Sequence, residues 1–387
     1  MKGNTRELFT KTFGAGLSEK VYSHGRLEII GNHTDHNHGL CLVAGASMGI
    51  EAEVAKNDYG VIKIISEGYP SFSFKIDELE KNPKEAGTSL AITRGIAFKL
   101  KEAGYQIGGF YAALTSDIFP GAGVSSSACY ESLIVSIFSH LYNQDKVTPL
   151  EEAKIGQFAE REYFGKPCGL LDQVGTSFGG IDYLDFKSTA NPIVENLKWD
   201  LPLQIVLVNT GGSHANLTPL YASIPSDMFL VAKRIFGKDY LREVDPADFE
   251  RWITSPNESV PVLARLRAQH FFDENRRVLD ARKALLEHDV DTFLNCIRFS
   301  SFSSKTMLQN TIANGDYEHS PQKALDIAER FLGGGAARIM GGGFAGSIIC
   351  FLYPDKVNDF IFNMGQVYGA NNVVKVSVIA GGPAWGK

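Results

Sequence analysis

A glycine- and serine-rich loop constrains the fold of this chain more than any other feature of its sequence. The loop reads Pro-Gly-Ala-Gly-Val-Ser-Ser-Ser-Ala and covers residues 120–128. Residues 110–115 before it predict a strand, and the apolar run at 127–142 after it predicts a long helix. Glycines let the backbone approach an anion, and a helix N-terminus carries about half a positive charge. The sequence therefore predicts a phosphate-binding turn in a mixed α/β fold. A tight turn with a serine N-cap is the simpler alternative.

The loop matches neither of the two common nucleotide-binding patterns. Ser126 stands where the G-x-G-x-x-G pattern requires its third glycine. The chain also contains no G-x-x-x-x-G-K-[ST] sequence. A nucleotide bound here must therefore be held by a different type of phosphate loop.

The length of the chain predicts more than one domain. A chain of 387 residues is too long for one ordinary core and suggests two or three domains. Strands and helices are mixed up to about residue 190, whereas residues 225–302 are mostly helical, charged and poor in glycine. We therefore expect an N-terminal domain at 1–190 and a C-terminal domain at 191–387. A strand pair expected around 373–379 could belong to either domain.

Charge and composition argue against several classes of binding partner and against a membrane or secreted protein. Lys and Arg number 38 against 44 Asp and Glu, so the net charge of −6 argues against nucleic acid and anionic membranes as partners. No apolar run reaches the ~18 residues of a membrane span, and the first residues lack the apolar core of a secretory signal. The five scattered cysteines form no C-x-x-C pair and indicate reduced thiols. We expect a soluble, cytoplasmic enzyme.

A second polar cluster follows an expected short strand near the N-terminus. It reads Gly-Arg-Leu-Glu-Ile-Ile-Gly-Asn-His-Thr-Asp-His-Asn-His-Gly and covers residues 25–39. Asp35 and His33 offer the acceptors and donors that a polyhydroxylated ligand needs. The spacing of His33, His36 and His38 could instead bind a metal ion, because imidazoles are good zinc ligands. Solvated loop histidines are the third possibility.

A third cluster contains two carboxylates. Glu160 lies on an expected helix, and Asp172 follows in the segment Cys-Gly-Leu-Leu-Asp-Gln at 168–173. Phosphoryl transfer needs a divalent ion to neutralise charge and a residue that orients the attacking hydroxyl. The two acids suit these two roles, although each taken alone could be an ordinary surface carboxylate.

The three clusters, in this order, resemble the motifs of the GHMP superfamily of small-molecule kinases, and galactokinases most of all. Residues 26–39 resemble the galactokinase signature at the sugar site, and residues 120–128 resemble the phosphate loop. The segment 168–173 is similar to the galactokinase sequence C-G-I-M-D-Q, and Met-Gly-Gly-Gly-Phe-Ala-Gly-Ser at 340–347 resembles the third motif. The resemblance implies an α+β, two-domain fold with the active site in the cleft between the domains.

The resemblance also implies a reaction, in which a sugar 1-kinase transfers the γ-phosphate of ATP to the anomeric hydroxyl of galactose. Asp172 would act as general base, with Arg26 keeping it ionised. Ser127 and Glu160 would hold Mg²⁺. The ATP phosphates would lie over a continuous run of loop residues, namely Gly121, Ala122, Gly123, Val124, Ser125, Ser126 and Ser127.

The sugar pocket implied by the resemblance draws on several parts of the chain. Asp35 would bind the ring hydroxyls O3 and O4, with His33 nearby and Asn32 facing O6. Backbone at Gly169 and the ring of Tyr221 would complete the pocket, next to Asp172. The glycine triplet at 341–343 would close the cleft from the C-terminal domain.

The chain departs from galactokinases at two positions of this pocket. Galactokinases usually carry Glu, which contacts the 6-hydroxyl, where this chain has Asn32, and Tyr where it has His36. These changes leave open a kinase for another sugar, such as an amino sugar, arabinose or another hexose. A non-catalytic sugar and ATP sensor is an alternative of a different class. We expect a monomer or weak dimer.

Overall fold

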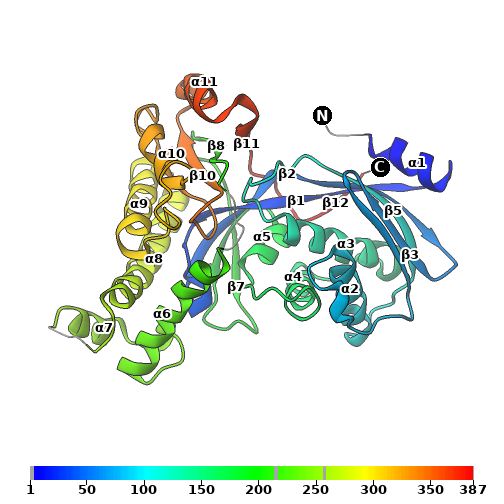
Figure 1. Ribbon diagram of the computed structural model, residues 1–387, viewed down its shortest axis with the longest axis horizontal. Helices are drawn as coiled ribbons and strands as arrows, with labels where there is room; N and C mark the ends of the chain where they lie inside the picture. The colour runs from blue at the N-terminus through cyan, green and yellow to red at the C-terminus, as the bar shows by residue number, and fades with distance from the viewer. Residues whose placement is uncertain (1–3, 213–216, 256–258, 387) are drawn as a thin grey trace.

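The structure is a computed structural model that describes residues 4–212, 217–255 and 259–386, arranged around two β-sheets (Figure 1). Within these residues the first sheet has eight strands in the order β12-β1-β2-β5-β3-β4, with β6 paired to β2 and β7 to β6. All pairs are antiparallel except the parallel pair β3–β5. The strands are β1 (Glu19–Ile30), β2 (Leu40–Asn57), β3 (Val61–Ser66), β4 (Tyr69–Lys75), β5 (Gly109–Ser116), β6 (Ile181–Asp185), β7 (Ile193–Leu197) and β12 (Ala384–Gly386).

Helices cover this sheet on both sides, and the alternation along β5 shows why. Phe110 and Leu114 are buried among apolar residues of the helices α2 and α3, whereas Tyr111 points the other way and stacks on Phe13 of α1 with ring centroids 5.0 Å apart. Figure 1 shows α1 on one side of the sheet and α2 to α5 on the other. The helices are α1 (Thr5–Phe13), α2 (Ser89–Glu102), α3 (Ser126–Asn143), α4 (Pro149–Phe158) and α5 (Leu171–Phe178).

The second sheet is smaller and lies between two helical layers. Its order is β11-β8-β10-β9, all antiparallel. Ile205 and Leu207 of β8 pack toward α8 and α9, and Val206 and Val208 pack toward α10 and α11. The elements are β8 (Gln204–Asn209), β9 (Ala336–Ile339), β10 (Ser347–Leu352), β11 (Val373–Val376), α6 (Thr218–Phe236), α7 (Pro246–Ile253), α8 (Val262–Glu287), α9 (Val290–Ser303), α10 (Pro321–Ala328) and α11 (Val357–Tyr368). In the described part of the chain, no helix is long and apolar enough to span a membrane.

The domain boundary expected between residues 190 and 191 lies in the connection between β6 and β7. β7 pairs with β6 in the first sheet, so that boundary falls inside a hairpin. The chain passes to the second sheet only between β7 and β8, and β12 returns to pair with β1. β7 is mostly exposed or half-exposed, so its sequence resembles a linker and only its pairing identifies it.

The two sheets share one hydrophobic core. Leu27 of β1 and Leu42 of β2 are buried in the same cluster as Ile205 of β8 and Val278 of α8. A core that crosses the boundary fixes the two parts of the chain against each other. The ends of β1 and β2 nearest this core carry the polar segment between them, residues 31–39, to the junction of the two parts.

Candidate active site

The glycine- and serine-rich loop joins β5 to α3, which begins at Ser126. Gly121 and Gly123 adopt left-handed backbone angles (φ 79° and 74°), and Ser125 does so as well (φ 56°). Only glycine adopts this conformation without strain, so the two glycines let the chain turn sharply into the helix. The predicted strand-turn-helix arrangement is therefore present.

Donors from both parts of the chain bind the carbonyl groups of this loop. The Arg26 backbone N–H donates to the Val124 carbonyl at 2.8 Å, from the first sheet. Asn209 Nδ2 donates to the Pro120 carbonyl at 2.8 Å, and Ser347 Oγ donates to the Gly121 carbonyl at 2.7 Å, from the second sheet. The loop is thus held on both sides by the protein itself.

Arg26, Asp172 and Ser125 meet beside the loop. Arg26 Nε donates to Asp172 Oδ1 and Ser125 Oγ donates to Asp172 Oδ2, both at 2.8 Å. Arg26 also donates to the Gly123 carbonyl. Its side chain is 6% exposed and that of Asp172 is 32% exposed. Burial alone would raise the pKa of Asp172, but the guanidinium and the hydroxyl outweigh it and hold this pKa below its usual value.

Ser127 and Glu160, predicted as metal ligands, also lie together. Ser127 Oγ donates to Glu160 Oε1 at 3.0 Å. The helix α4 passes into a π-helical turn at 159–164, which carries Glu160 into the interior at 1% exposure. Sequence analysis missed two further contacts of this carboxylate. Gln173 Nε2 donates to Oε2 at 2.8 Å, and Lys166 Nζ lies 3.1 Å from Oε1. In the sequence, Lys166 lies midway between Glu160 and Asp172, and a cation at that place could have indicated contact with one of the acids.

Asp35 and Gly169, two predicted sugar ligands, are brought into close contact. A Cβ atom added to Gly169 would lie 2.0 Å from Asp35 Oδ2, so a side chain at this position would displace the Asp35 carboxylate. The His36 backbone N–H donates to Asp35 Oδ1 at 2.9 Å. The side chain of Asp35 is 13% exposed and keeps carboxylate surface for a ligand.

Asn32, predicted to face O6 of the sugar, uses its side-chain amide for contacts within the protein. Its Nδ2 donates to Glu28 Oε1 at 2.8 Å and to the Gly341 carbonyl at 2.6 Å. Its Oδ1 accepts from Asn310 Nδ2 at 2.9 Å, and the residue is 1% exposed. An amide has two N–H donors, and both are used within the protein. Sequence reasoning missed this because the partners lie more than 270 residues away, apart from Glu28.

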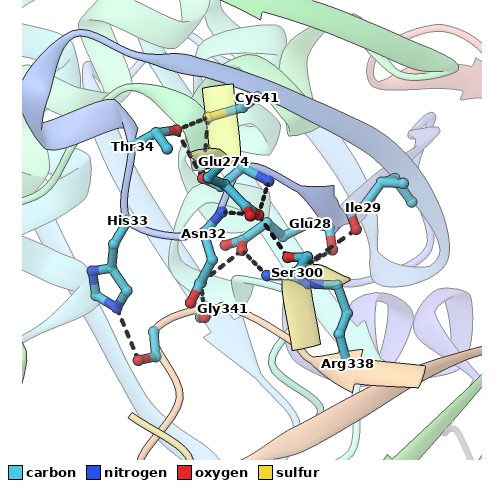
Figure 2. A network of polar contacts seen from close by, with 12 residues as sticks. Glu28, Ile29, Asn32, His33, Thr34, Cys41, Glu274, Ser300, Arg338 and Gly341 are labelled. Atoms are coloured by element: carbon cyan, nitrogen blue, oxygen red, sulfur yellow. Dashed lines mark hydrogen bonds and ion pairs between the residues drawn. The ribbon is translucent and has the colours of Figure 1, made fainter. Parts of the chain in front are cut away.

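Three predicted sugar ligands bind the three carbonyls of the glycine triplet. Asn32 binds Gly341, His33 Nε2 donates to the Gly342 carbonyl at 2.9 Å, and Tyr221 Oη donates to the Gly343 carbonyl at 2.9 Å (Figure 2 shows the first two). The triplet thus lies against the sugar signature, as expected for a turn that closes the junction.

Burial changes the titration of two of these side chains. Burial lowers the pKa of His33 to about 3, and it raises the pKa of Tyr221 to about 12. Both are therefore neutral at pH 7. Among the described residues His33 Nδ1 is buried without a hydrogen-bond partner, so it remains available as an acceptor.

Sequence analysis also missed a charged network that anchors the signature. Arg338 is fully buried, and its guanidinium donates to Glu28 Oε1 and to the Glu28 carbonyl, both at 3.0 Å (Figure 2). Glu274 Oε1 accepts from the Gly31 N–H at 3.0 Å and from Ser300 Oγ at 2.6 Å. The pKa of Glu274 is lowered to about 2: burial would raise it, but the nearby Arg277 and other cations outweigh burial. The network binds β1 and the signature to α8, α9 and β9.

The histidines of the signature do not form a metal site. Where the structure describes the chain, no group of three His, Cys, Asp or Glu side chains could hold a metal ion. His33 and His36 have ring centroids 5.6 Å apart, while His38 stacks on Tyr240 at 3.7 Å. Ser127 and Glu160 offer the oxygen ligands that Mg²⁺ prefers, and Mg²⁺ usually needs only one or two protein ligands besides phosphate and water.

Comparison with known families supports the motifs one by one. The family description "Galactokinase galactose-binding signature" matches residues 7–56, which include the segment 25–39. The description "GHMP kinases N terminal domain" matches residues 91–180, which include the phosphate loop and both predicted acids.

Whole-chain comparison gives the same result. A galactokinase of Glaesserella parasuis is 30% identical over 90% of this chain and 89% of its own length. A galactokinase of Pyrococcus furiosus is 29% identical over 87% and 89%. The crystal structure of Lactococcus lactis galactokinase complexed with galactose has a TM-score of 0.84 at 27% identity and covers 98% of each chain.

The mevalonate kinase of Methanococcus jannaschii shares the fold, with a TM-score of 0.67 at 15% identity over 94% of this chain. The expected α+β, two-domain GHMP kinase fold is thus confirmed. This chain belongs to the galactokinase family of the GHMP kinases.

Proposed function

We propose that this protein is an ATP-dependent galactokinase, which transfers the γ-phosphate of ATP to the anomeric hydroxyl of galactose. The observation that carries the proposal is the meeting of Arg26, Asp172 and Ser125 beside the phosphate loop. It places a carboxylate, a cation and a helix N-terminus together, which is the combination that phosphoryl transfer requires. The names of the relatives supply the substrate.

The loop suits the phosphates of ATP. Protein donors bind the carbonyls of Pro120, Gly121, Gly123 and Val124, so these oxygens are turned away from an incoming anion. The N-terminal N–H groups of α3 and its dipole would then face the phosphates. In this proposal all seven residues from 121 to 127 line the phosphate site.

Asp172 would accept a hydrogen bond from the anomeric hydroxyl and orient it for attack. Arg26 keeps the carboxylate ionised and makes it a weak base, because its pKa lies below the usual value. The reaction would therefore depend mainly on positioning and on stabilisation of charge, as expected for a loose phosphoryl-transfer transition state. Arg26 supplies part of that stabilisation.

Ser127 and Glu160 would hold Mg²⁺ through their side-chain oxygens, which now share one hydrogen bond. When bound, the ion would neutralise charge on the phosphates. The near-complete burial of Glu160 and its bond from Gln173 fix the orientation of this carboxylate before any ligand arrives.

Asp35, with Gly169 behind it, would bind the ring hydroxyls of the sugar, and His33 Nδ1 and Tyr221 would border the pocket. Asn32 would then be a wall of the pocket and not a ligand of O6. This arrangement keeps open the choice between galactose and a sugar without a free 6-hydroxyl.

The test is ADP production with a panel of sugars. We expect galactose to give the highest kcat/KM, with measurable turnover of 6-deoxygalactose and arabinose. ATP binding without turnover of any sugar would contradict the proposal and favour a sensor. In this proposal the protein acts in the cytoplasm, where its five free cysteines would stay reduced, and it is a monomer or weak dimer.

A further inference from the structure

Lys166 lies at the outer side of the Ser127–Glu160 pair, in the turn before α5. Its Nζ is 3.1 Å from Glu160 Oε1, the same oxygen that accepts the Ser127 hydroxyl. The side chain of Lys166 is 55% exposed, whereas that of Glu160 is 2% exposed. Gln173, which binds the other oxygen, is buried. Lys166 is therefore the donor on this carboxylate that reaches solvent.

The backbone turn at Gly165 places Lys166 next to Glu160. Gly165 adopts a left-handed conformation with φ 90°, which favours glycine. The N–H groups of Gly165 and Lys166 both donate to the Glu160 carbonyl, at 3.0 Å and 3.1 Å. The turn thus folds residue 166 back over Glu160 and fixes the start of its side chain.

Arg26 lies beside Asp172 and Lys166 lies beside Glu160, and the two cations differ in exposure and flexibility. Arg26 is 6% exposed and is bonded both to Asp172 and to the Gly123 carbonyl. Lys166 has a flexible four-carbon stem and an exposed head. A lysine ammonium is positively charged at neutral pH, so it can pair with a carboxylate or with a phosphate.

We propose that Lys166 is a phosphate-contacting residue of the transfer reaction. It neutralises Glu160 while no metal ion is bound, and it turns to the phosphate oxygens of ATP when Mg²⁺ takes its place on Glu160. The Lys166 side chain is flexible and 55% exposed, so its ammonium can turn away from Glu160 when a divalent ion binds there. Lys166 keeps its protons and forms no covalent bond. This inference rests on the proposed function, because it assigns a residue to the same site.

The test compares three variants. Lys166→Met removes the charge and keeps most of the stem, Lys166→Arg keeps the charge, and Arg161→Met removes an exposed cation next to Glu160 in the sequence. Three quantities are measured: kcat with galactose, the Kd of ATP in EDTA by calorimetry, and Mn²⁺ binding to the complex with a non-hydrolysable ATP analogue by electron paramagnetic resonance. Melting temperatures check folding, and Lys166→Gln is a second neutral variant.

For Lys166→Met we expect a kcat lower by about 10- to 100-fold, as for loss of one donor to transition-state charge. Metal-free ATP should bind about tenfold more weakly, because the site loses one of its two cations and keeps only Arg26. Mn²⁺ should bind equally well or more tightly, since its competitor on Glu160 is gone. Lys166→Arg should stay within about threefold of wild type in kcat, and Arg161→Met should match wild type.

A kcat and a metal-free ATP affinity within twofold of wild type in both neutral variants would overturn the inference. Weaker Mn²⁺ binding with unchanged metal-free ATP affinity would also overturn it, because Lys166 would then only order Glu160. If wild type phosphorylates no sugar, the proposed function fails instead, and the metal-free ATP titration still tests Lys166.

Discussion

The phosphate side and the sugar side of the site use their polar groups in opposite ways. On the phosphate side, Asp172 and Lys166 remain 32% and 55% exposed, and their contacts come from the first part of the chain. On the sugar side, Asn32 and His33 are 1% and 8% exposed, and they bind carbonyls of the glycine triplet.

The residues on the phosphate side are in position for a ligand, whereas those on the sugar side close the junction between two parts of the chain. Asp172 and Lys166 are positioned by neighbours within one part of the chain and keep surface for a ligand. The signature residues use their donors to hold two parts of the chain together, so their substitution should first change stability. Each prediction below tests one side of this comparison.

The largest effect should come from Asp172→Asn, on the phosphate side. We expect kcat to fall by about 10²–10⁴-fold, the usual contribution of a positioned general base. The fold should persist because the side chain is partly exposed and keeps its size. Steady-state kinetics and circular dichroism check both points, and a kcat within threefold of wild type would remove Asp172 from the mechanism.

Asn32→Glu should have the next largest effect, on stability. The new carboxylate would face Glu28 and the Gly341 carbonyl, both of which need a donor. We expect a loss of about 3 kcal/mol in the free energy of unfolding, because a buried charge would lack a partner.

The double variant Glu28→Gln with Asn32→Glu is the control for this effect. It again pairs one amide with one carboxylate, and Arg338 still has a carboxylate nearby. We expect it to recover at least about 1 kcal/mol relative to the sum of the two single changes. If the changes in the free energy of unfolding of the two single variants, measured in urea, add up to that of the double variant, then Asn32 and Glu28 are not coupled.

Low pH should reduce the free energy of unfolding through His33, on the sugar side. Its folded pKa of about 3 lies below the usual value, so below pH 6.5 the unfolded chain binds the proton and the folded chain does not. Stability therefore falls as pH falls, by up to about 2 kcal/mol between pH 7 and pH 5. Glu152 and Asp182, with pKa values raised by burial to about 8 and about 7, shift stability the other way.

For this reason the measurement is the difference between wild type and His33→Gln, whose amide can still donate to Gly342. The variant should lose less stability than wild type between pH 7 and pH 5. If the free energy of unfolding of wild type and of His33→Gln changes equally with pH, then His33 is solvated in solution and the junction is open.

The smallest effect should come from Glu160→Gln, on the phosphate side. We expect the Mg²⁺ concentration for half-maximal rate to rise about tenfold, because a neutral amide is a weaker ligand than a carboxylate. The KM for galactose should not change, since Glu160 is assigned to the metal ion and not to the sugar. Unchanged Mg²⁺ dependence would leave Glu160 a structural partner of Gln173.

Local sequence patterns predicted much of the fold. The helix expected at 127–142 is α3 at Ser126–Asn143, and the strand expected at 110–115 is β5 at Gly109–Ser116. Both have strong apolar patterns and lie next to glycine, so short-range information sufficed. β7 was missed because its alternation is weak and its place in the sheet depends on β6.

By itself the sequence determined the family and the strand-turn-helix around residues 120–128, because these depend on residue types in fixed local order. The pairing of Asp172 with Arg26, 146 residues apart, was implied only by the family resemblance. Only the tertiary structure decided the role of Asn32. Its partners Gly341 and Asn310 are distant in the sequence, and hydrogen bonding depends on distance and direction between groups that no local pattern specifies. The same holds for Lys166, since the left-handed turn at Gly165 brings its ammonium to Glu160.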